Sequence, residues 1–146
     1  MTEAEAQAFV TKYAAVWAAG VSDDFRTVWH EDETLHHPML DRKLKGRDIP
    51  DLHRLQKAAA PTLVWHLEGW TRRQDTVVVE WLCTTDAARG QFAWRGVDKF
   101  RVLDGRIIEE RVYSDTAPLR AARRGEALEP MMRFAPADSG ASGKPS

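Results

Sequence analysis

Regular alternation of apolar and polar residues in the second half of the chain is the feature that most constrains its fold. The alternation runs through four segments, residues 62–73, 76–85, 90–103 and 106–115. A period of two is the pattern of a β-strand with one buried face. Asp104-Gly105 between the last two segments is a strong hairpin signal. The sequence therefore predicts four strands connected as an antiparallel meander.

The residues before the meander have helical spacing instead. Residues 2–19 predict an amphipathic helix that begins with a capping box of Thr2 and Glu5 and ends at Gly20. Large apolar side chains recur at helical intervals along it, at Phe9, Tyr13, Val16 and Trp17.

Two further helices are expected before the meander. The first is short, covers residues 22–29 and has Trp29 on its apolar side. The second covers residues 48–60, with Asp48 as its N-cap. Two brief extended segments lie between these helices, at residues 33–38 and 41–46.

Helices followed by a meander predict an α+β domain in which the helices pack on one face of the sheet. A strongly twisted sheet of this kind closes around its helices like a cone and leaves an interior cavity. The length of 146 residues suits one domain, which we place at residues 1–134. Residues 135–146, "APADSGASGKPS", have the composition of a disordered tail.

Composition excludes several classes of protein. A formal net charge of −1 argues against nucleic acid or an anionic membrane as the main partner. The single cysteine, Cys83, rules out an internal disulfide and fits a reducing compartment. The N-terminus has no secretion-signal pattern and no apolar run reaches the length of a membrane span, so a cytoplasmic protein is expected.

Asp98 occupies an unusual position in the third predicted strand. Alternation places it on an apolar face, whereas the opposite face is cationic. Burying a carboxylate among aromatic rings is costly, so Asp98 either faces a cavity or pairs with an arginine at its rim. The residues of the apolar face are Phe92, Trp94, Asp98, Phe100 and Val102, and those of the cationic face are Arg95, Lys99 and Arg101.

Three motifs carry a family resemblance: "KYAAVWAAG" at 12–20, "HHP" at 36–38 and "GVDKFRVLDGRIIEERVY" at 96–113. With this order of elements, roughly residues 3–119 resemble the nuclear transport factor 2 (NTF2)-like superfamily, especially its SnoaL-like polyketide cyclase and ketosteroid isomerase branches. The resemblance implies a cone-shaped α+β domain with an interior pocket. It also implies a homodimer formed through the sheet.

The resemblance to the isomerase branch implies roles for three residues. Tyr13 and a protonated Asp98 match the two donors that hold a developing oxyanion. His37 precedes Pro38 where the isomerase has its aspartate base, and an imidazole with a pKa near ~6.5 is a suitable base at neutral pH. The cyclase branch usually has histidine at the position of Asp98, and its acid/base aspartate falls on Val112 here.

Other candidate residues keep two interpretations each. Glu110 shares the inward face of its strand, and it could either tune the protonation of Asp98 or form an ion pair at the rim. His66 faces inward if the isomerase pattern is followed and outward if strict alternation is followed. Arg120, Arg123 and Arg124 form either a solvated face or a contact for an acidic substrate group. Further pocket-lining candidates are Trp17, Trp81, Cys83, Phe92 and Val112, although core packing explains the aromatic ones almost as well.

Two functions of different classes follow from these residues. The first is an enzyme that moves protons without a cofactor, in an isomerisation, cyclisation or dehydration of a small, largely apolar carbonyl or hydroxyl compound. The second is a non-catalytic module for ligand binding or assembly. No metal is expected, because the group His30, Asp32, His36 and His37 matches no ligand spacing.

Overall fold

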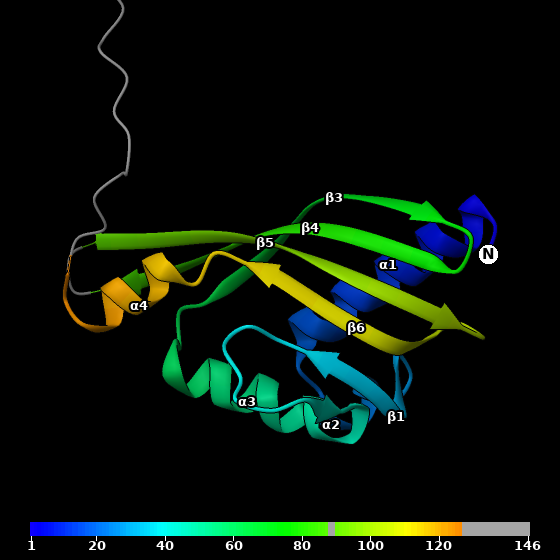
Figure 1. Ribbon diagram of the computed structural model, residues 1–146, viewed down its shortest axis with the longest axis horizontal. Helices are drawn as coiled ribbons and strands as arrows, with labels where there is room; N and C mark the ends of the chain where they lie inside the picture. Colours follow the sequence, from blue (N-terminus) through cyan, green and yellow to red (C-terminus); the bar gives the residue numbers. More distant parts are fainter. Residues whose placement is uncertain (88–89, 127–146) are drawn as a thin grey trace, which may run out of the picture.

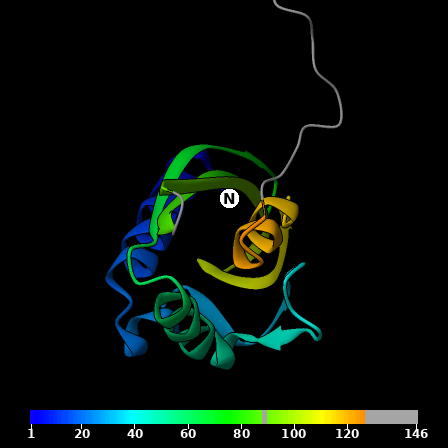
Figure 2. The same ribbon diagram turned by 90° about the vertical axis from the view of Figure 1, so that its left-hand side faces the viewer.

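The computed structural model describes residues 1–87 and 90–126. Helices and a curved sheet enclose a common interior, as expected for the α+β class (Figures 1 and 2). The expected domain boundary at residue 134 and the expected tail lie outside the described residues. In chain order the elements are α1 (Glu3–Ala19), α2 (Ser22–Phe25), β1 (Trp29–His36), β2 (Leu44–Lys45), η1 (Gly46–Asp48), α3 (Ile49–Ala59), β3 (Val64–Arg73), β4 (Thr76–Ala87), β5 (Gly90–Leu103), β6 (Arg106–Ser114) and α4 (Ala117–Arg123).

The sheet has six strands in the order β2-β1-β6-β5-β4-β3. Its β3–β6 part is the predicted antiparallel meander. Asp104 and Gly105 have φ values of 50° and 73° at the last hairpin, which is the left-handed conformation that their Asp-Gly sequence favours. The two short extended segments predicted at residues 33–38 and 41–46 overlap β1 and β2. Their place in the sheet was not predicted: β1 pairs with β6 in parallel, and β2 pairs with β1.

The predicted second helix was too long. α2 ends at Phe25, and Trp29 begins β1. The residues between them form a turn, in which the backbone N–H groups of Thr27 and Val28 donate to the carbonyls three residues earlier, both at 2.9 Å. The hydroxyl of Thr27 also donates to the carbonyl of Asp24 at 2.7 Å, so the side chain competes with continuation of the helix. The backbone N–H of Ile107 donates to the carbonyl of Val28 at 2.7 Å, which ties this segment to β6.

The helix-capping predictions had different outcomes. Thr2 and Glu5 form the predicted capping box of α1, and Gly20 ends the helix with a φ of 64°. Asp48 does not cap α3 with its side chain. Its carboxylate instead accepts a hydrogen bond from the backbone N–H of Lys45 at 3.0 Å, which holds the short η1 turn before α3.

The core lies between α1 and the concave face of the sheet (Figure 2). Phe9 and Tyr13 of α1 contact Phe100 of β5, with ring centroids 5.8 and 4.9 Å apart. Trp29 of β1 lies 5.5 Å from Tyr13 and 5.5 Å from Phe25. This aromatic packing fixes α1 against β5 and so determines which side chains of both elements meet.

A β-bulge in β3 decides which residues of that strand face inward. The register with β4 shifts between Leu67 and Gly69. Trp65 before the bulge and Trp70 after it both pack against the core, although their spacing of five does not fit strict alternation. His66 is exposed, so the sequence pattern that turned it inward was wrong.

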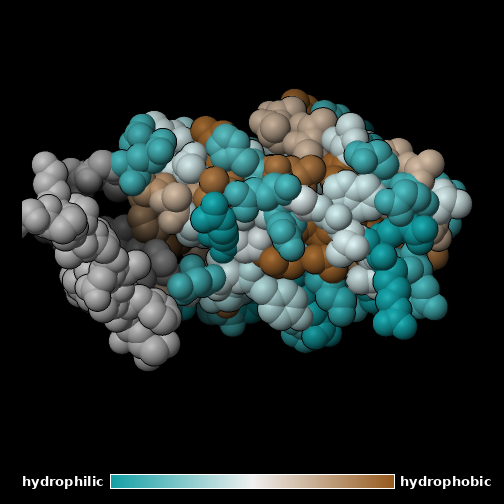
Figure 3. All heavy atoms as spheres, turned by 90° about the horizontal axis from the view of Figure 1, so that it is seen from above, coloured by the Kyte–Doolittle hydropathy of each residue, from teal (hydrophilic) through white to brown (hydrophobic). Residues whose placement is uncertain are grey.

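The outer surface mixes hydrophilic residues with scattered hydrophobic ones (Figure 3). Val64 and Tyr113 are exposed hydrophobic residues of β3 and β6, with 49% and 55% of their surface accessible. The homodimer expected through the sheet stays a prediction. Among the described residues, no helix has both the length and the apolar character needed to cross a membrane.

Candidate functional site

A cavity of about 440 Å³ lies between α1, α3 and the concave face of the sheet. Aliphatic and aromatic side chains from α3, β3 and β5 make up much of its wall, and Leu119 of α4 borders it. All nine residues predicted for the site line this cavity: Tyr13, Trp17, His37, Trp81, Cys83, Phe92, Asp98, Glu110 and Val112.

Asp98 is 4% exposed and accepts two hydrogen bonds inside the protein. The hydroxyl of Tyr13 donates to its Oδ2, and Nε1 of Trp81 donates to its Oδ1, both at 2.9 Å. Burial raises the pKa of Asp98 to about 6, although the hydrogen bonds from Trp81 and Tyr13 oppose this shift by favouring the charged form. The hydrogen-bond partners of Asp98 are the neutral donors Tyr13 and Trp81. The alternative prediction, an ion pair between Asp98 and an arginine at the rim, was therefore wrong.

The hydroxyl group of Tyr13 donates its hydrogen bond to Asp98. The side chain of Tyr13 is almost completely buried. This burial and the nearby carboxyl groups of Asp98 and Glu110 raise the pKa of Tyr13 well above its usual value. The phenol therefore stays protonated and orients the Asp98 carboxyl group. This arrangement differs from the expected one, in which Tyr13 and Asp98 each donate to a ligand.

Glu110 is the second carboxyl group in the cavity. It pairs with Phe100 in the register of β5 and β6, two residues from Asp98 on the inward face, and diagonal neighbours of this kind are roughly 7–8 Å apart. Glu110 is 5% exposed and its Oε2 accepts from Nε1 of Trp29 at 2.7 Å. Burial, with the nearby Asp98 and Glu33, raises the pKa of Glu110 well above its usual range. The alternative of a rim ion pair was therefore wrong.

His37 lies where the chain leaves β1, beside the cavity. Its Nδ1 accepts a hydrogen bond from the backbone N–H of Met39 at 3.1 Å, so the proton of the neutral ring is on Nε2. Burial lowers the pKa of His37 to about 4, below the neutral range expected from the sequence. At neutral pH the ring can therefore donate a hydrogen bond from Nε2.

Cys83 is a buried thiol. It is 5% exposed, and burial and the nearby Asp98 raise its pKa to about 12. Its thiolate is therefore scarce at neutral pH, and the side chain acts as a small apolar part of the wall. Within residues 1–87 and 90–126, no three His, Cys, Asp or Glu side chains are arranged to hold a metal ion.

Gly96 is a residue of the site that sequence reasoning missed. It lies opposite Trp81 in the register of β4 and β5, and a Cβ at this position would overlap the indole ring. The missing side chain lets the indole lie across β5 and reach Asp98 with its Nε1. A glycine inside a strand signals close approach of another group, but only the strand register identifies that group as Trp81.

We expect Gly96→Ala to lower the free energy of unfolding by roughly 1–3 kcal/mol, because the added methyl group displaces a buried indole. The pKa of Asp98 should rise at the same time, since the Trp81 hydrogen bond lowers it. Chemical unfolding measures the first effect, and NMR titration of the Asp98 carboxyl carbon measures the second. Gly69→Ala in β3 is the matched control, because a Cβ there has only ordinary contacts. Equal effects of both substitutions would contradict this account.

Comparison with known proteins agrees with the fold of the helices and the curved sheet. Residues 10–110 match the family model described as a SnoaL-like domain. The chain belongs to this family, within the NTF2-like superfamily, as the sequence motifs indicated. None of the curated proteins compared with the chain matches it.

Solved structures share the fold at low sequence identity. AclR from Streptomyces galilaeus, named as a hydroxylase, has a TM-score of 0.72 at 18% identity over 89% of this chain and 87% of its own. A Bacillus cereus protein named as a polyketide cyclase has a TM-score of 0.74 at 17% identity over 84% and 83%. TerC, co-crystallised with polyporic acid, has a TM-score of 0.71 at 15% identity over 82% and 98%. At these sequence identities, the similarity is evidence for a shared fold.

Proposed function

We propose that the protein is a cofactor-independent acid–base enzyme acting on a small, largely apolar carbonyl or hydroxyl compound. One observation carries the proposal: two buried carboxyl groups, Asp98 and Glu110, line the same cavity in different environments. Asp98 accepts two hydrogen bonds that favour its charged form, whereas Glu110 accepts one. Environments that separate the pKa values of two such groups divide the roles of acid and base between them.

Asp98 is the proposed base. With a pKa of about 6 it is mostly ionised at neutral pH, yet it binds a proton more tightly than an ordinary carboxylate. Its hydrogen bonds to Tyr13 and Trp81 hold it in one orientation. It removes a proton from a carbon next to a carbonyl group of the substrate, and the electrons of that C–H bond move towards the carbonyl oxygen.

Glu110 is the proposed acid. Its raised pKa keeps it protonated, so it can donate its proton to the oxygen that gains charge. His37 supplies a second donor through Nε2. When the carbonyl forms again, the enol hydroxyl returns its proton to Glu110. The proton held by Asp98 then goes to another carbon, to the oxygen of a second carbonyl group that the enol carbon attacks, or to a hydroxyl on the β-carbon that leaves as water. These outcomes correspond to isomerisation, cyclisation and dehydration.

One structural neighbour supports this class of chemistry by its name: the Bacillus cereus protein is named as a polyketide cyclase. AclR, named as a hydroxylase, shares the fold but is named for a different reaction. TerC was co-crystallised with polyporic acid, which supports a small organic molecule as the occupant of such a cavity. The mainly apolar wall around the two carboxyl groups fits a ligand with few polar groups.

Glu110→Gln tests the proposal once a substrate is identified by mass spectrometry of molecules retained on the purified protein. The substitution keeps the shape but removes the transferable proton, so kcat should fall by about 10²–10⁴-fold, the usual contribution of a general acid. The control is Glu109→Gln on the same strand, because Glu109 pairs with Arg111 outside the cavity. An unchanged kcat in Glu110→Gln would contradict the proposed role.

A non-catalytic binding module is the second candidate. The observation in its favour is Val112, which lines the cavity at the position of the acid/base aspartate of the cyclase branch. In this case the retained molecule would be recovered unchanged from both the native protein and Glu110→Gln. The two candidates therefore differ in the chemical fate of the bound molecule.

A further inference from the structure

A second cavity of about 370 Å³, which is wide open to solvent, adjoins the first. His37, Leu40 and Val112 line both cavities, so they form a shared wall. The remaining lining of the second cavity comes from the end of β1 and the chain between β1 and β2, and it is more polar: His36, Pro38, Asp41, Arg42 and Lys43.

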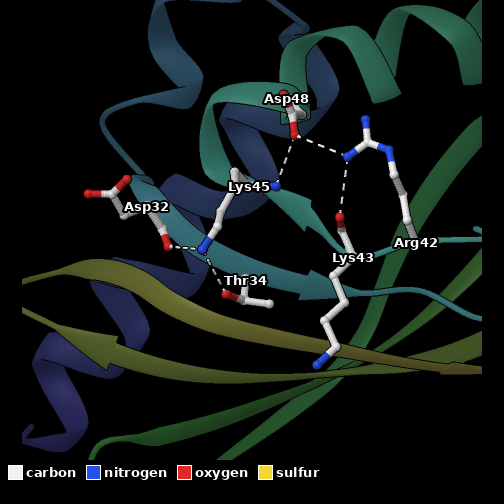
Figure 4. A network of polar contacts seen from close by, with 6 residues as sticks. All are labelled: Asp32, Thr34, Arg42, Lys43, Lys45 and Asp48. Atoms are coloured by element: carbon white, nitrogen blue, oxygen red, sulfur yellow. Dashed lines mark hydrogen bonds and ion pairs between the residues drawn. The ribbon is translucent and has the colours of Figure 1, made fainter.

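The second cavity carries two permanent cations against one acid. Arg42, Lys43 and Asp41 line it together, and both cations are exposed to solvent. Figure 4 shows the arrangement of the neighbouring charges. Arg42 donates to the carbonyl of Lys43 at 3.3 Å and reaches the Asp48 carboxylate only at 3.8 Å, so much of its capacity for hydrogen bonding is unused.

Lys43 differs from its neighbour Lys45. Nζ of Lys45 donates to the carbonyl of Asp32 and to the hydroxyl of Thr34, whereas the Lys43 ammonium is directed away from this network (Figure 4). Lys43 has no carboxylate within ion-pair distance in the part of the chain that the structure describes. Burial lowers the pKa of His36 most, and the charges of Lys43 and Arg111 lower it as well. Both cations therefore lie near His36, which lines this cavity. Glu109 opposes them, but it is paired with Arg101 and Arg111.

We propose that the second cavity binds an anionic group, a carboxylate or a phosphate, of the same molecule whose apolar body fills the first cavity. This inference rests on the proposed function, which identifies the first cavity as the substrate site. The charges also fix the orientation of the ligand: ionised Asp98 would repel an anion from the first cavity, whereas Arg42 and Lys43 attract it to the second. The substrate class is therefore an amphipathic organic anion.

Two fluorescent probes with the same ring system test this inference. Anilinonaphthalene sulfonate carries an anionic group, and phenylnaphthylamine has the same aromatic body without it. We expect the double substitution Arg42→Gln and Lys43→Gln to weaken binding of the sulfonate roughly three- to tenfold, as for the loss of two partly exposed charge pairs. Binding of the neutral probe should be unchanged. Added salt should weaken only the sulfonate in the native protein.

The matched control is Arg73→Gln, which removes an exposed cation at the β3–β4 turn and should affect neither probe. Competition by naphthoate and by naphthyl phosphate then distinguishes a carboxylate from a phosphate. Equal effects of the double substitution on both probes, or no effect on the sulfonate, would overturn the inference, as would failure of the native protein to bind the sulfonate. Because neither probe is turned over, these results are independent of the activity of Glu110→Gln.

Discussion

Asp98→Asn should lower kcat by about 10²–10⁴-fold, the loss expected when a general base is removed. Asparagine has the shape of aspartate but cannot accept a proton from a substrate. Both carboxylate oxygens of Asp98 accept a hydrogen bond, from Tyr13 and Trp81. The amide –NH₂ group must therefore face one of these donors, and the free energy of unfolding should also fall by roughly 1–3 kcal/mol.

Trp81→Phe separates the catalytic effect from the structural one. It keeps the Asp98 carboxylate but removes a hydrogen bond that lowers its pKa. The rise of kcat/KM with pH, which should follow ionisation of Asp98 at about pH 6 in the native enzyme, should therefore move to higher pH in this variant. pH–rate profiles of both enzymes measure the shift.

The oxyanion-hole role expected from the family resemblance gives a different result. A protonated Asp98 that only donates a hydrogen bond can be replaced by asparagine, which also donates, with little loss of ligand binding or turnover. An Asp98→Asn variant that keeps its full kcat would therefore contradict the base role and favour the oxyanion hole. Asp98→Ala, which can neither accept nor donate, should be impaired in both cases.

Glu33→Gln should stabilise the protein at alkaline pH. Glu33 is 1% exposed, and neither of its carboxyl oxygens has a hydrogen-bond partner among the described residues. Burial raises its pKa from 4.5 to about 8, with Lys45 opposing and Glu109 supporting the shift. Between pH 4.5 and about pH 8, Glu33 is therefore neutral in the folded protein and charged in the unfolded chain.

The sign of the pH dependence follows from this raised pKa. The contribution of Glu33 to stability is fully present below its unfolded pKa of 4.5 and is lost as the pH rises through about 8. Glutamine does not ionise, so near pH 9 the variant should exceed the native protein by roughly 4–5 kcal/mol, because the pKa rises from 4.5 to about 8 and each pKa unit corresponds to about 1.4 kcal/mol. The difference should disappear near pH 4.

Urea unfolding of both proteins across this pH range measures the effect. Glu31→Gln is the control, because Glu31 is an exposed residue of the same strand. Parallel pH dependence of Glu33→Gln and the native protein would show that Glu33 is not held neutral by the fold. The pH dependence of the difference, rather than its size at one pH, is the decisive result.

Local sequence patterns determined α1, the β3–β6 meander and the inward face of β5. The capping box at Thr2, the Asp104-Gly105 turn and the alternation around Asp98 each depend on residues a few positions apart. Propensity, capping and turn geometry act over this range, so these features can be predicted without knowing the pairing of strands. The placement of Asp98 on an apolar face followed from period two alone.

Only the tertiary structure decided what surrounds that carboxyl group. Tyr13 is 85 residues from Asp98 in the chain, and Trp81 reaches it because Gly96 lies opposite Trp81 in the strand register. The parallel pairing of β1 with β6 buries Glu110 beside Trp29, and the bulge in β3 turns Trp70 inward. Hydrogen-bond partners, burial and the resulting pKa values depend on contacts between distant segments. Sequence periodicity assigns a side chain to a face but not to a neighbour.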